Sequence, residues 1–347
     1  MSNCWQEKTV QLNFLWGELR LGTLRLRGLV LTHGLHPQDV VSVPELPASV
    51  DVAVIRSHYL SGSFPQYSST AGAFRYIPDR YYRYYVDLRQ TLPHYLAKFS
   101  SKSRYTLLKK VRRFKKLSDG KIDVREFSRP GQIDEFHALA CQISAKTYQE
   151  RLLAAGMPDD PGFVAEMRRM SEAGAVRAYV LFLQDRPIAY MYCAAMEGND
   201  LMYRFVGYDP EHSHISPGVV LHYLALERLF AEQRFDSLDF GEGSGTHKQF
   251  FSTGSLACAD LYYFRDTARH RAIAALHAML RLSSRTVAGL LQALGLKPRL
   301  KKLLREGTTS MVRSAAKKAP VLAERHPKAD ADHPAEPVQA GWREKIG

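Results

Sequence analysis

Hydrophobic and polar positions alternate over most of the first 90 residues, with the period of β-strands. Gly17, Gly22 and Gly28 separate the first of these alternating runs. This pattern predicts short strands at residues 9–15, 19–26, 29–32 and 50–56, followed by a Ser- and Gly-rich loop at 61–73. Residues 74–88 interleave aromatic and basic side chains. That composition is typical either of a strand of packed tyrosines or of a surface that stacks single-stranded nucleic acid.

Helical periodicity begins after this segment. Apolar residues recur at helical spacing in residues 92–117, with Pro93 near the start and basic residues between them. The same spacing predicts helices at 131–155 and 161–173, with a short strand at 123–127 before them.

A strand meander follows, and it is the clearest pattern in the chain. Three apolar runs at residues 176–183, 188–196 and 201–208 are separated by the turn sequences QDRP and EGND. The next segment, 216–233, is apolar on nearly every side and predicts a buried helix. Strands at 235–240 and 256–264 flank a short helix at 245–252, and we expect the long segment 266–294 to form a basic helix that docks on the body. Residues 306–347 are rich in Ala, Pro and charge, which predicts a disordered tail.

Composition and charge narrow the possible functions. The chain has 347 residues, enough for about two domains, and a formal net charge of +13. Nine Lys or Arg and no acid lie in residues 98–116, and ten against one acid lie in 265–305. The rest of the chain is mildly acidic, so the two basic helices stand out from it. They would either bind an anionic partner or simply expose their basic faces to solvent.

Other classes of protein are disfavoured by what the sequence lacks. The four cysteines are scattered without a C-x-x-C pair, which indicates reduced thiols rather than disulfides or zinc ligands. The sequence begins without a secretory signal pattern, and an apolar run of 11 residues near the C-terminus, 286–296, is too short to cross a membrane. We expect a cytoplasmic protein, either free or peripheral to the inner membrane, with no bound metal.

One local motif points to chemistry. A meander strand ends at Tyr208, and a loop then delivers Ser216, Pro217 and Gly218 at a helix start. Proline suits the first helical turn, and glycine lets a ligand approach the backbone closely. The free N–H groups and the helix dipole predict a pyrophosphate site, unless Ser216 is a plain helix cap.

Four strings together resemble the GNAT acyltransferase superfamily. They are SSKSRYTLLKKVRRFKK at 100–116, RPIAYMY at 186–192, HISPGVVLHYLALERLF at 214–230 and FDSLDFGEGSGTHKQFFS at 235–252. More closely, the chain resembles the bacterial acetyltransferase-like family associated with cellulose and exopolysaccharide synthesis, a relative of the Fem-type aminoacyl transferases.

The resemblance implies an α/β (α+β) protein with a mixed central sheet flanked by helices. It implies a degenerate N-terminal GNAT-like half at 1–92, a basic connecting helix at 93–117 and a C-terminal acyltransferase domain at 118–265. A basic helical extension at 266–305 and the tail would complete the chain. The implied donor is acetyl-CoA or another acyl-CoA, although the loop reads HSHISPG where the superfamily usually has Gln/Arg-x-x-Gly-x-Gly/Ala. The implied donor-binding residues are Tyr208, Ser216, Pro217, Gly218, Val219 and Lys248.

Acyl transfer to an amine needs a base for the ammonium proton and an acid for the leaving thiolate. The glycine-rich stretch 239–248 offers Asp239, Glu242 and His247 as bases, and Tyr262 in the last strand is a candidate proton donor, with Tyr263 as the other. Turn capping by Asp239 and a structural role for Lys248 are equally compatible with the sequence.

The resemblance leaves three functional hypotheses open. The first is an N-acetyltransferase-like enzyme that moves an acyl group from acyl-CoA to an amine or hydroxyl of a cell-envelope or exopolysaccharide precursor. The second is Fem-like aminoacyl transfer from charged tRNA, in which the basic helix at 98–116 would face the nucleic acid. The third is a non-catalytic protein on a GNAT scaffold, docked on anionic membrane through residues 265–305.

Overall fold

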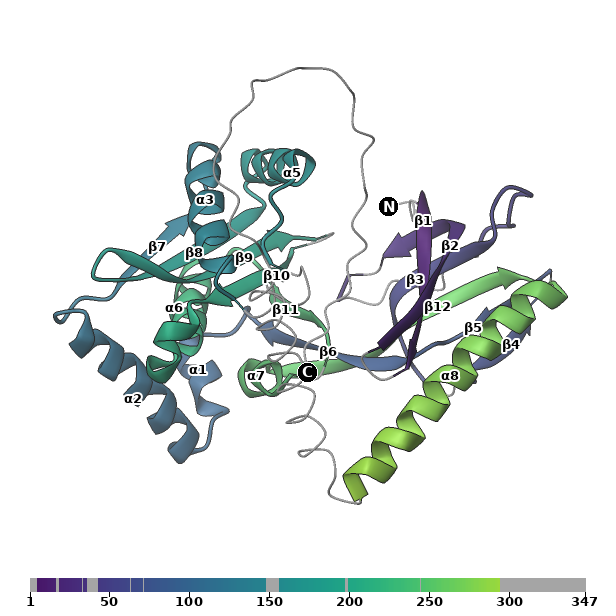
Figure 1. Ribbon diagram of the computed structural model, residues 1–347. Coiled ribbons are helices and arrows are strands. Elements are labelled where there is room, and N and C mark those ends of the chain that lie inside the picture. The colour runs from purple at the N-terminus through teal and green to yellow at the C-terminus, as the bar shows by residue number, and fades with distance from the viewer. Residues whose placement is uncertain are drawn as a thin grey trace, which may run out of the picture.

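A computed structural model describes residues 5–16, 19–32, 34–35, 43–62, 64–70, 72–147, 156–196, 199–243 and 245–293. Two lobes share a single sheet of twelve strands (Figure 1). The predicted α/β class with a large mixed sheet flanked by helices is confirmed. The predicted tail at 306–347 and residues 294–305 lie outside the described residues.

The N-terminal lobe is built mainly from strands. These are β1 (Gln6–Trp16), β2 (Leu19–Thr32), β3 (Val52–Tyr59), β4 (Tyr67–Thr70) and β5 (Ala73–Tyr76). β2 is one strand across Gly28, where two were predicted; a side chain there would collide with Val10, so glycine lets β1 and β2 approach closely. The long helix α8 (Ala268–Ala293) covers one face of this lobe, although it comes from the far end of the described chain.

The C-terminal lobe is a layer of strands between two layers of helices. Its strands are β7 (Asp123–Phe127), β8 (Val176–Leu183), β9 (Arg186–Ala195), β10 (Asp200–Tyr208) and β11 (Ser237–Glu242). Its helices are α1 (Leu92–Ala97), α2 (Ser101–Leu117), η1 (Pro130–Gln132), α3 (Ile133–Ser144), α5 (Pro161–Glu172), η2 (Pro210–Ile215), α6 (Pro217–Glu232) and α7 (Thr246–Phe251). The predicted meander is confirmed as β8, β9 and β10, which pair antiparallel in succession.

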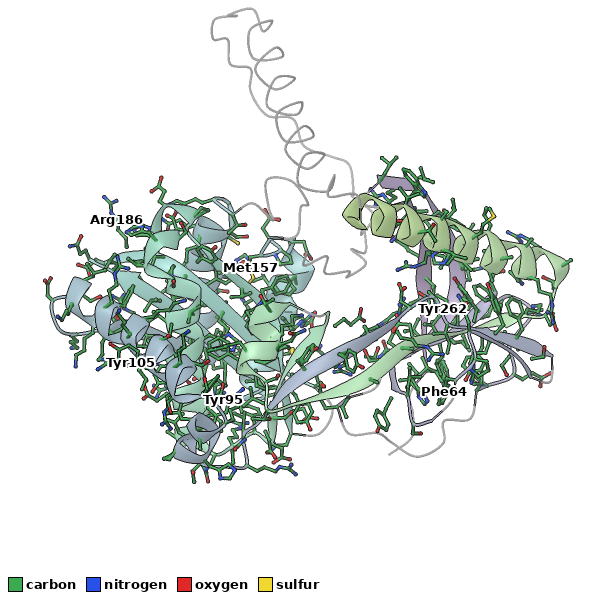
Figure 2. The ribbon with its side chains drawn as sticks, turned by 90° about the horizontal axis from the view of Figure 1, so that it is seen from below. Phe64, Tyr95, Tyr105, Met157, Arg186 and Tyr262 are labelled. Atoms are coloured by element: carbon green, nitrogen blue, oxygen red, sulfur yellow. The ribbon has the colours of Figure 1, made fainter. Side chains whose placement is uncertain are left out.

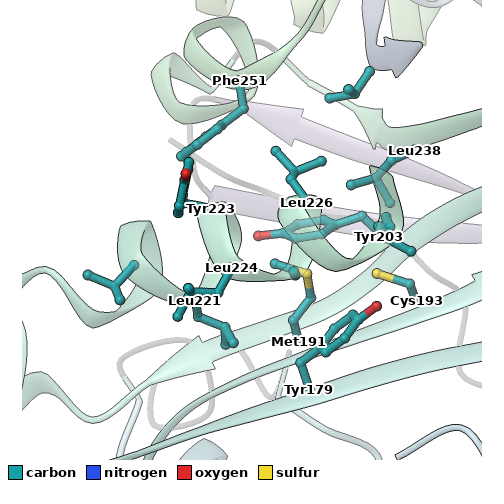
Figure 3. Close-up of a cluster of buried hydrophobic side chains, with 14 of the residues drawn as sticks. Tyr179, Met191, Cys193, Tyr203, Leu221, Tyr223, Leu224, Leu226, Leu238 and Phe251 are labelled. Carbon is teal, nitrogen blue, oxygen red and sulfur yellow. The ribbon is translucent and has the colours of Figure 1, made fainter. Parts of the chain in front are cut away.

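Alternate residues of the meander face opposite helix layers. Tyr179 and Met191 point toward α6, in a core that also contains Leu221 and Leu226 (Figure 3). Their neighbours point the other way, into a second core against α3 and α5. This alternation explains why these strands are apolar at most positions: the sheet is buried on both faces.

The lobes are joined by strands rather than by a linker. β6 (Arg80–Asp87) lies between β11 and β12 (Gly254–Arg265) in the sheet, antiparallel to both. β12 pairs with β6 through its first half and with β3 and β5 through its second half. The sheet order is therefore β1-β2-β3-β12-β6-β11-β10-β9-β8-β7. The halves proposed at 1–92 and 118–265 thus exchange strands within one sheet, and their division into domains stays a prediction.

Two predicted helices differ from the structure. The segment 92–117 is two helices, because the Ser100 hydroxyl accepts a hydrogen bond from the Ser103 N–H at 3.2 Å and starts α2 afresh. The helix predicted at 131–155 is described as η1 followed by α3, which ends at Ser144. Its last predicted residues, 148–155, lie outside the described part of the chain.

Candidate functional site

The parallel strands β10 and β11 stay together for only three positions. Asp200, Leu201 and Met202 pair with Ser237, Leu238 and Asp239, and the register goes no further. Both strands continue beyond this point, β10 to Tyr208 and β11 to Glu242, so they diverge. Beyond the pair of Met202 and Asp239, the edges of β10 and β11 that face each other form a wedge in the middle of the sheet.

The N-terminus of α6 follows the end of β10. Its cap residue, Ser216, is in the left-handed region at φ 55°, and its hydroxyl makes no capping hydrogen bond. The Val219 and Val220 N–H groups instead donate to the Ser216 carbonyl at 3.1 and 3.2 Å. The alternative of a plain serine cap is therefore wrong. The bend at Ser216 sets the axis of α6 without using its side chain.

Gly218 lies against the end of β10. A β-carbon built on Gly218 would be 3.5 Å from the Tyr208 ring, which is ordinary van der Waals contact. Tyr208 is exposed and Pro217 is buried. The structure thus brings together five of the predicted donor-binding residues: Tyr208, Ser216, Pro217, Gly218 and Val219.

A basic surface flanks this helix start. Helix α2 contacts both α6 and η2, and its buried face contains Leu107 and Phe114. Its outward residues are exposed: Lys102, Arg104, Tyr105, Lys109, Arg112, Arg113, Lys115 and Lys116. None of these cations forms an ion pair with a described residue. Tyr105 is on the outer side of α2 (Figure 2), with Arg112 5.6 Å from its ring centroid. The exposed cations of α2 form a surface to which the predicted anionic partner could bind.

The loop after β11 is held together by Lys248. This side chain is fully buried, and its ammonium donates to the Glu242 carbonyl oxygen at 2.6 Å. Gly241 and Gly243 have φ values of 70° and 107°, which side chains rarely adopt, so glycine is required at both positions. The Lys248 ammonium lies inside the loop rather than on a surface where it would meet a phosphate. We therefore assign it a structural role.

Two histidines lie near this loop. Burial is the main cause that lowers the pKa of His247, and the nearby charge of Lys248 adds to it. His222, on α6 one turn after Gly218, is buried and stacks on Phe251 with ring centroids 4.1 Å apart. Burial, with smaller contributions from His247 and Lys98, lowers the pKa of His222 to about 3. Both imidazoles are therefore neutral at pH 7, and a neutral imidazole can accept a proton.

Lys98 connects α1 to this group. Its ammonium lies 4.4 Å from the Phe99 ring centroid and donates to the Phe250 carbonyl at 2.9 Å and to the Ser252 carbonyl. Although much of the residue is exposed, desolvation of the ammonium lowers the pKa of Lys98 to about 8. Lys98 therefore fixes the C-terminal end of α7 and keeps positive charge near His222.

Asp239 is already paired. Its carboxylate accepts hydrogen bonds from the guanidinium of Arg83 on β6 and from the Gly241 N–H, the latter at 2.8 Å. Only 1% of Asp239 and 3% of Arg83 are exposed. A carboxylate with these partners and no solvent is placed to position the loop, whereas Glu242 at the end of β11 is exposed.

Tyr262 lies in the other lobe. On β12 it pairs with Val54 of β3 and Tyr76 of β5, whereas Leu256, opposite Arg83, is six residues earlier. At about 3.3 Å per residue this separation is roughly 20 Å. Figure 2 shows Tyr262 in the lobe opposite to Tyr95. The structure therefore does not bring Tyr262 to the other predicted catalytic residues, and its hydroxyl accepts from Arg56 at 3.1 Å.

Sequence patterns single out neither Arg83 nor His222, and they include Lys98 only as the first residue of the basic segment 98–116. Arg83 and His222 are polar residues in an aromatic and an apolar segment, and that mismatch is their only local signal. His222 occurs in an otherwise apolar run of α6, and Arg83 occurs among the tyrosines of β6.

Metal and thiol chemistry find little support in the described residues. No cluster of three or more His, Cys, Asp or Glu there is arranged to hold a metal ion. Cys193 is buried, which raises the pKa of its thiol, and Cys141, Cys193 and Cys258 are free thiols.

Part of the chain matches a known family of domains. Residues 101–249 match the family described as "Acetyltransferase (GNAT) domain". This segment of the chain is a GNAT acetyltransferase-like domain. It begins at α2 and ends within α7, so it contains the end of β10, the start of α6 and the loop after β11. It leaves out Arg83, Lys98, Phe251 and Tyr262. The match covers this segment and not the rest of the chain.

Solved structures with similar folds are distant in sequence. One is FemX, at 10% identity, with 78% of this chain and 90% of that chain covered and a TM-score of 0.46. Another is the C-terminal domain of a putative lysylphosphatidylglycerol synthetase from Agrobacterium fabrum, at 12% identity, 67% and 73% coverage and a TM-score of 0.44. A third is L-PGS from Bacillus licheniformis, at 13% identity, 65% and 72% coverage and a TM-score of 0.42. No curated protein matches the chain. With TM-scores below 0.5, none of these structures defines a substrate here.

Proposed function

We propose that the protein transfers an acyl group, most simply acetyl, from acyl-CoA to an amine or hydroxyl of a cell-envelope or exopolysaccharide precursor. The observation that carries the proposal is the divergence of β10 and β11 after three paired positions, with the start of α6 beside it. Unpaired strand edges offer backbone hydrogen bonds to an extended, amide-containing donor. The α6 N-terminus offers its dipole to the donor's phosphates.

The residues fit the donor in charge as well as in shape. Coenzyme A is polyanionic, and the unpaired cations of α2 flank the start of α6. Gly218 adds no side chain at the helix start, and the exposed ring of Tyr208 lies beside it as a surface on which a donor could pack. Only the sequence resemblance supports a cell-envelope or exopolysaccharide precursor as the acceptor.

The chemistry assigned to this chain is proton transfer and positioning. When the acceptor amine attacks the thioester carbonyl carbon, a C–N bond forms, the C–S bond breaks, and the ammonium proton must leave. We assign His247 as the base, because its lowered pKa keeps the imidazole neutral near pH 7. The thiolate then takes a proton from water or from the protonated base. Asp239 holds the loop through Arg83 and the Gly241 N–H.

Binding of the donor tests the proposal directly. Thermal unfolding of the full chain should be followed with coenzyme A, acetyl-CoA and longer acyl-CoAs. A ligand at 100 times its dissociation constant stabilises the folded state by about 2.7 kcal/mol, a readily measured shift. No shift with any acyl-CoA at millimolar concentration would refute the donor assignment.

One observation favours a second function, aminoacyl transfer from charged tRNA. The exposed cations of α2 have no described ionic partners and surround the exposed ring of Tyr105, which is a surface suited to a nucleic-acid backbone. Triple replacement of Lys109, Arg112 and Arg113 by Gln separates the two donors. For tRNA, affinity should fall steeply. The number of counterions released on binding, measured from the salt dependence of the affinity, should decrease by about three. For acyl-CoA, affinity should change by about tenfold or less, since one small ligand meets few of these cations.

A further inference from the structure

Helix α8 is apolar on two opposite sides. Its inner side packs on the N-terminal lobe through Ile273, Ala274 and His277. Its outer side should be polar in a solvated helix, because a surface helix normally has one apolar stripe. Instead, an exposed apolar stripe runs along it, formed by Ala268, Ala272, Ala275, Leu276, Met279 and Leu282.

The large side chains of this stripe are well exposed. Leu276 is 48% exposed, Met279 is 59% and Leu282 is 65%. They recur every three residues, so they lie along one side of the helix over almost two turns. Scattered exposed leucines are ordinary, but a contiguous apolar stripe indicates a contact with something outside the described residues.

A second exposed apolar group lies next to α8. Trp16, Leu19 and Leu21, at the end of the β1–β2 hairpin, are 42%, 62% and 54% exposed. The hairpin passes under α8 just before this end: the Phe14 ring meets His277 edge-on at 5.4 Å, and His277 bonds the Asn13 carbonyl at 3.1 Å. Trp16 is two residues, about 7 Å, beyond that contact.

The charge around these residues is positive. Helix α8 has four arginines and no Asp or Glu. Arg269 and Arg271 border the stripe on its two sides, and Arg20 and Arg25 are exposed on β2. Arg269, Arg20 and Arg25 form no ion pair with a described residue. Arg271 pairs with Asp266 and also lines a cavity of about 160 Å³ with Ser68 and Ser69.

We propose that the stripe of α8 and the end of the β1–β2 hairpin, together the α8 surface, lie on an anionic lipid bilayer. Apolar side chains with a tryptophan would enter the interface, while the arginines would pair with lipid phosphates, as in helices that lie in the membrane plane. A second copy of the chain suits this surface less well. A two-fold contact would bring Arg20, Arg25 and Arg269 of the two copies together, and none of these three has an acidic partner among the described residues.

Vesicle binding of the full chain tests the proposal. The probes are vesicles of phosphatidylcholine alone and vesicles in which about a third of the lipid is phosphatidylglycerol. We expect co-flotation with the anionic vesicles only, decreasing with salt because exposed charges are screened over about 8 Å at physiological ionic strength. Leu276→Gln/Met279→Gln/Leu282→Gln should weaken binding about tenfold or more, since three apolar side chains leave the interface. Tyr82→Gln/Leu117→Gln, which removes two exposed large side chains outside the α8 surface, should bind like the unmodified chain. Equal binding by the triple variant and the unmodified chain would overturn the proposal.

A labelling measurement separates the other occupants of the surface. Met279→Cys in the full chain should react fast with a soluble maleimide in buffer and slowly with anionic vesicles present, as followed by mass spectrometry of that peptide. Slow reaction without vesicles, at concentrations where the chain is monomeric, would show that the residues after Ala293 cover the stripe. Slow reaction that appears only as the chain dimerises would show a second copy there. Either result would overturn the lipid assignment.

Discussion

Arg83 of β6 pairs with Asp239 of β11 in the part of the sheet where the two lobes meet. The contact joins residues 156 positions apart, and both side chains are almost completely buried. Arg83 also donates to the Gly34 carbonyl at 3.2 Å, so the guanidinium ties three segments together. Glu242 ends β11 three residues after Asp239, and His247 follows in α7, so the pair fixes the strand end that leads to both.

Removal of Arg83 alone should be costly. Arg83→Met leaves the Asp239 carboxylate buried without its cation, and we expect a loss of about 3–5 kcal/mol in the free energy of unfolding. Arg83→Met/Asp239→Asn removes the charge as well and should recover at least about 1 kcal/mol of that loss. Arg89→Met breaks an exposed pair with Asp87 and should cost less than about 1 kcal/mol. Urea unfolding of the four proteins measures these differences, and a double variant less stable than Arg83→Met would contradict the argument.

The start of α6 offers a matched pair of substitutions. Gly218→Ala adds a methyl group at ordinary contact distance from Tyr208. This variant should fold like the unmodified chain, and its dissociation constant for the donor should change by less than about threefold. Gly218→Glu places bulk and negative charge where a phosphate would lie, and should weaken donor binding by about a hundredfold or more while the protein stays folded. Calorimetric titration with coenzyme A measures both variants. Equal affinity of Gly218→Glu and Gly218→Ala would remove the anion site from this helix.

The acid limb of the pH profile should report His247. Burial and the charge of Lys248 lower the pKa of His247 below its usual value near 6.5. Its base form therefore persists to lower pH than in a free histidine, and kcat should fall only as the pH drops through the lowered pKa. His247→Ala should reduce kcat by about a hundredfold or more, with little change in KM for the donor, and should remove that limb. His94→Ala, at an exposed histidine of α1, serves as the control. An unchanged acid limb in His247→Ala would transfer the role of base to another residue, with Glu242→Gln as the next test.

Local pattern was sufficient for most of the fold. The meander, the apolar helix α6 and the short helix α7 follow from hydrophobic period and from turn residues, both of which act over a few residues. Pattern also predicted an anion site at Ser216, Pro217 and Gly218, and the resemblance added Tyr208 and Val219. These residues are close together in the chain, so local sequence was enough to group them.

The positions of Tyr262 and Arg83 could not be predicted from the sequence, because they depend on contacts between distant segments. Tyr262 follows the loop of Glu242 by only 20 positions, yet β12 carries it into the other lobe. Likewise β6, from the first quarter of the chain, lies between β11 and β12 and supplies Arg83. Strand order of this kind is set by which edges pair in three dimensions. Periodicity along the chain does not contain that information.

The last prediction concerns His222, whose Nε2 has no hydrogen-bond partner among the described residues. Its ring lies among Phe251, Phe240 and Tyr203, and burial is the main reason that its pKa falls to about 3. An unfolded chain binds a proton at this histidine below about pH 6.5, whereas the folded chain does not.

Stability should therefore decrease as the pH falls from 7 toward 5, by about 2 kcal/mol for this one group, since each pH unit below the unfolded pKa costs about 1.4 kcal/mol. His222→Phe keeps a ring of similar size against Phe251 and cannot take up a proton. The difference in unfolding free energy between pH 7 and pH 5 should accordingly be about 2 kcal/mol smaller in His222→Phe than in the unmodified chain, as measured by urea unfolding at both pH values. His94→Gln, at an exposed histidine, should retain the full difference. If His222→Phe loses as much stability as the unmodified chain between these pH values, His222 is protonated in the folded protein and a partner for its Nε2 must exist.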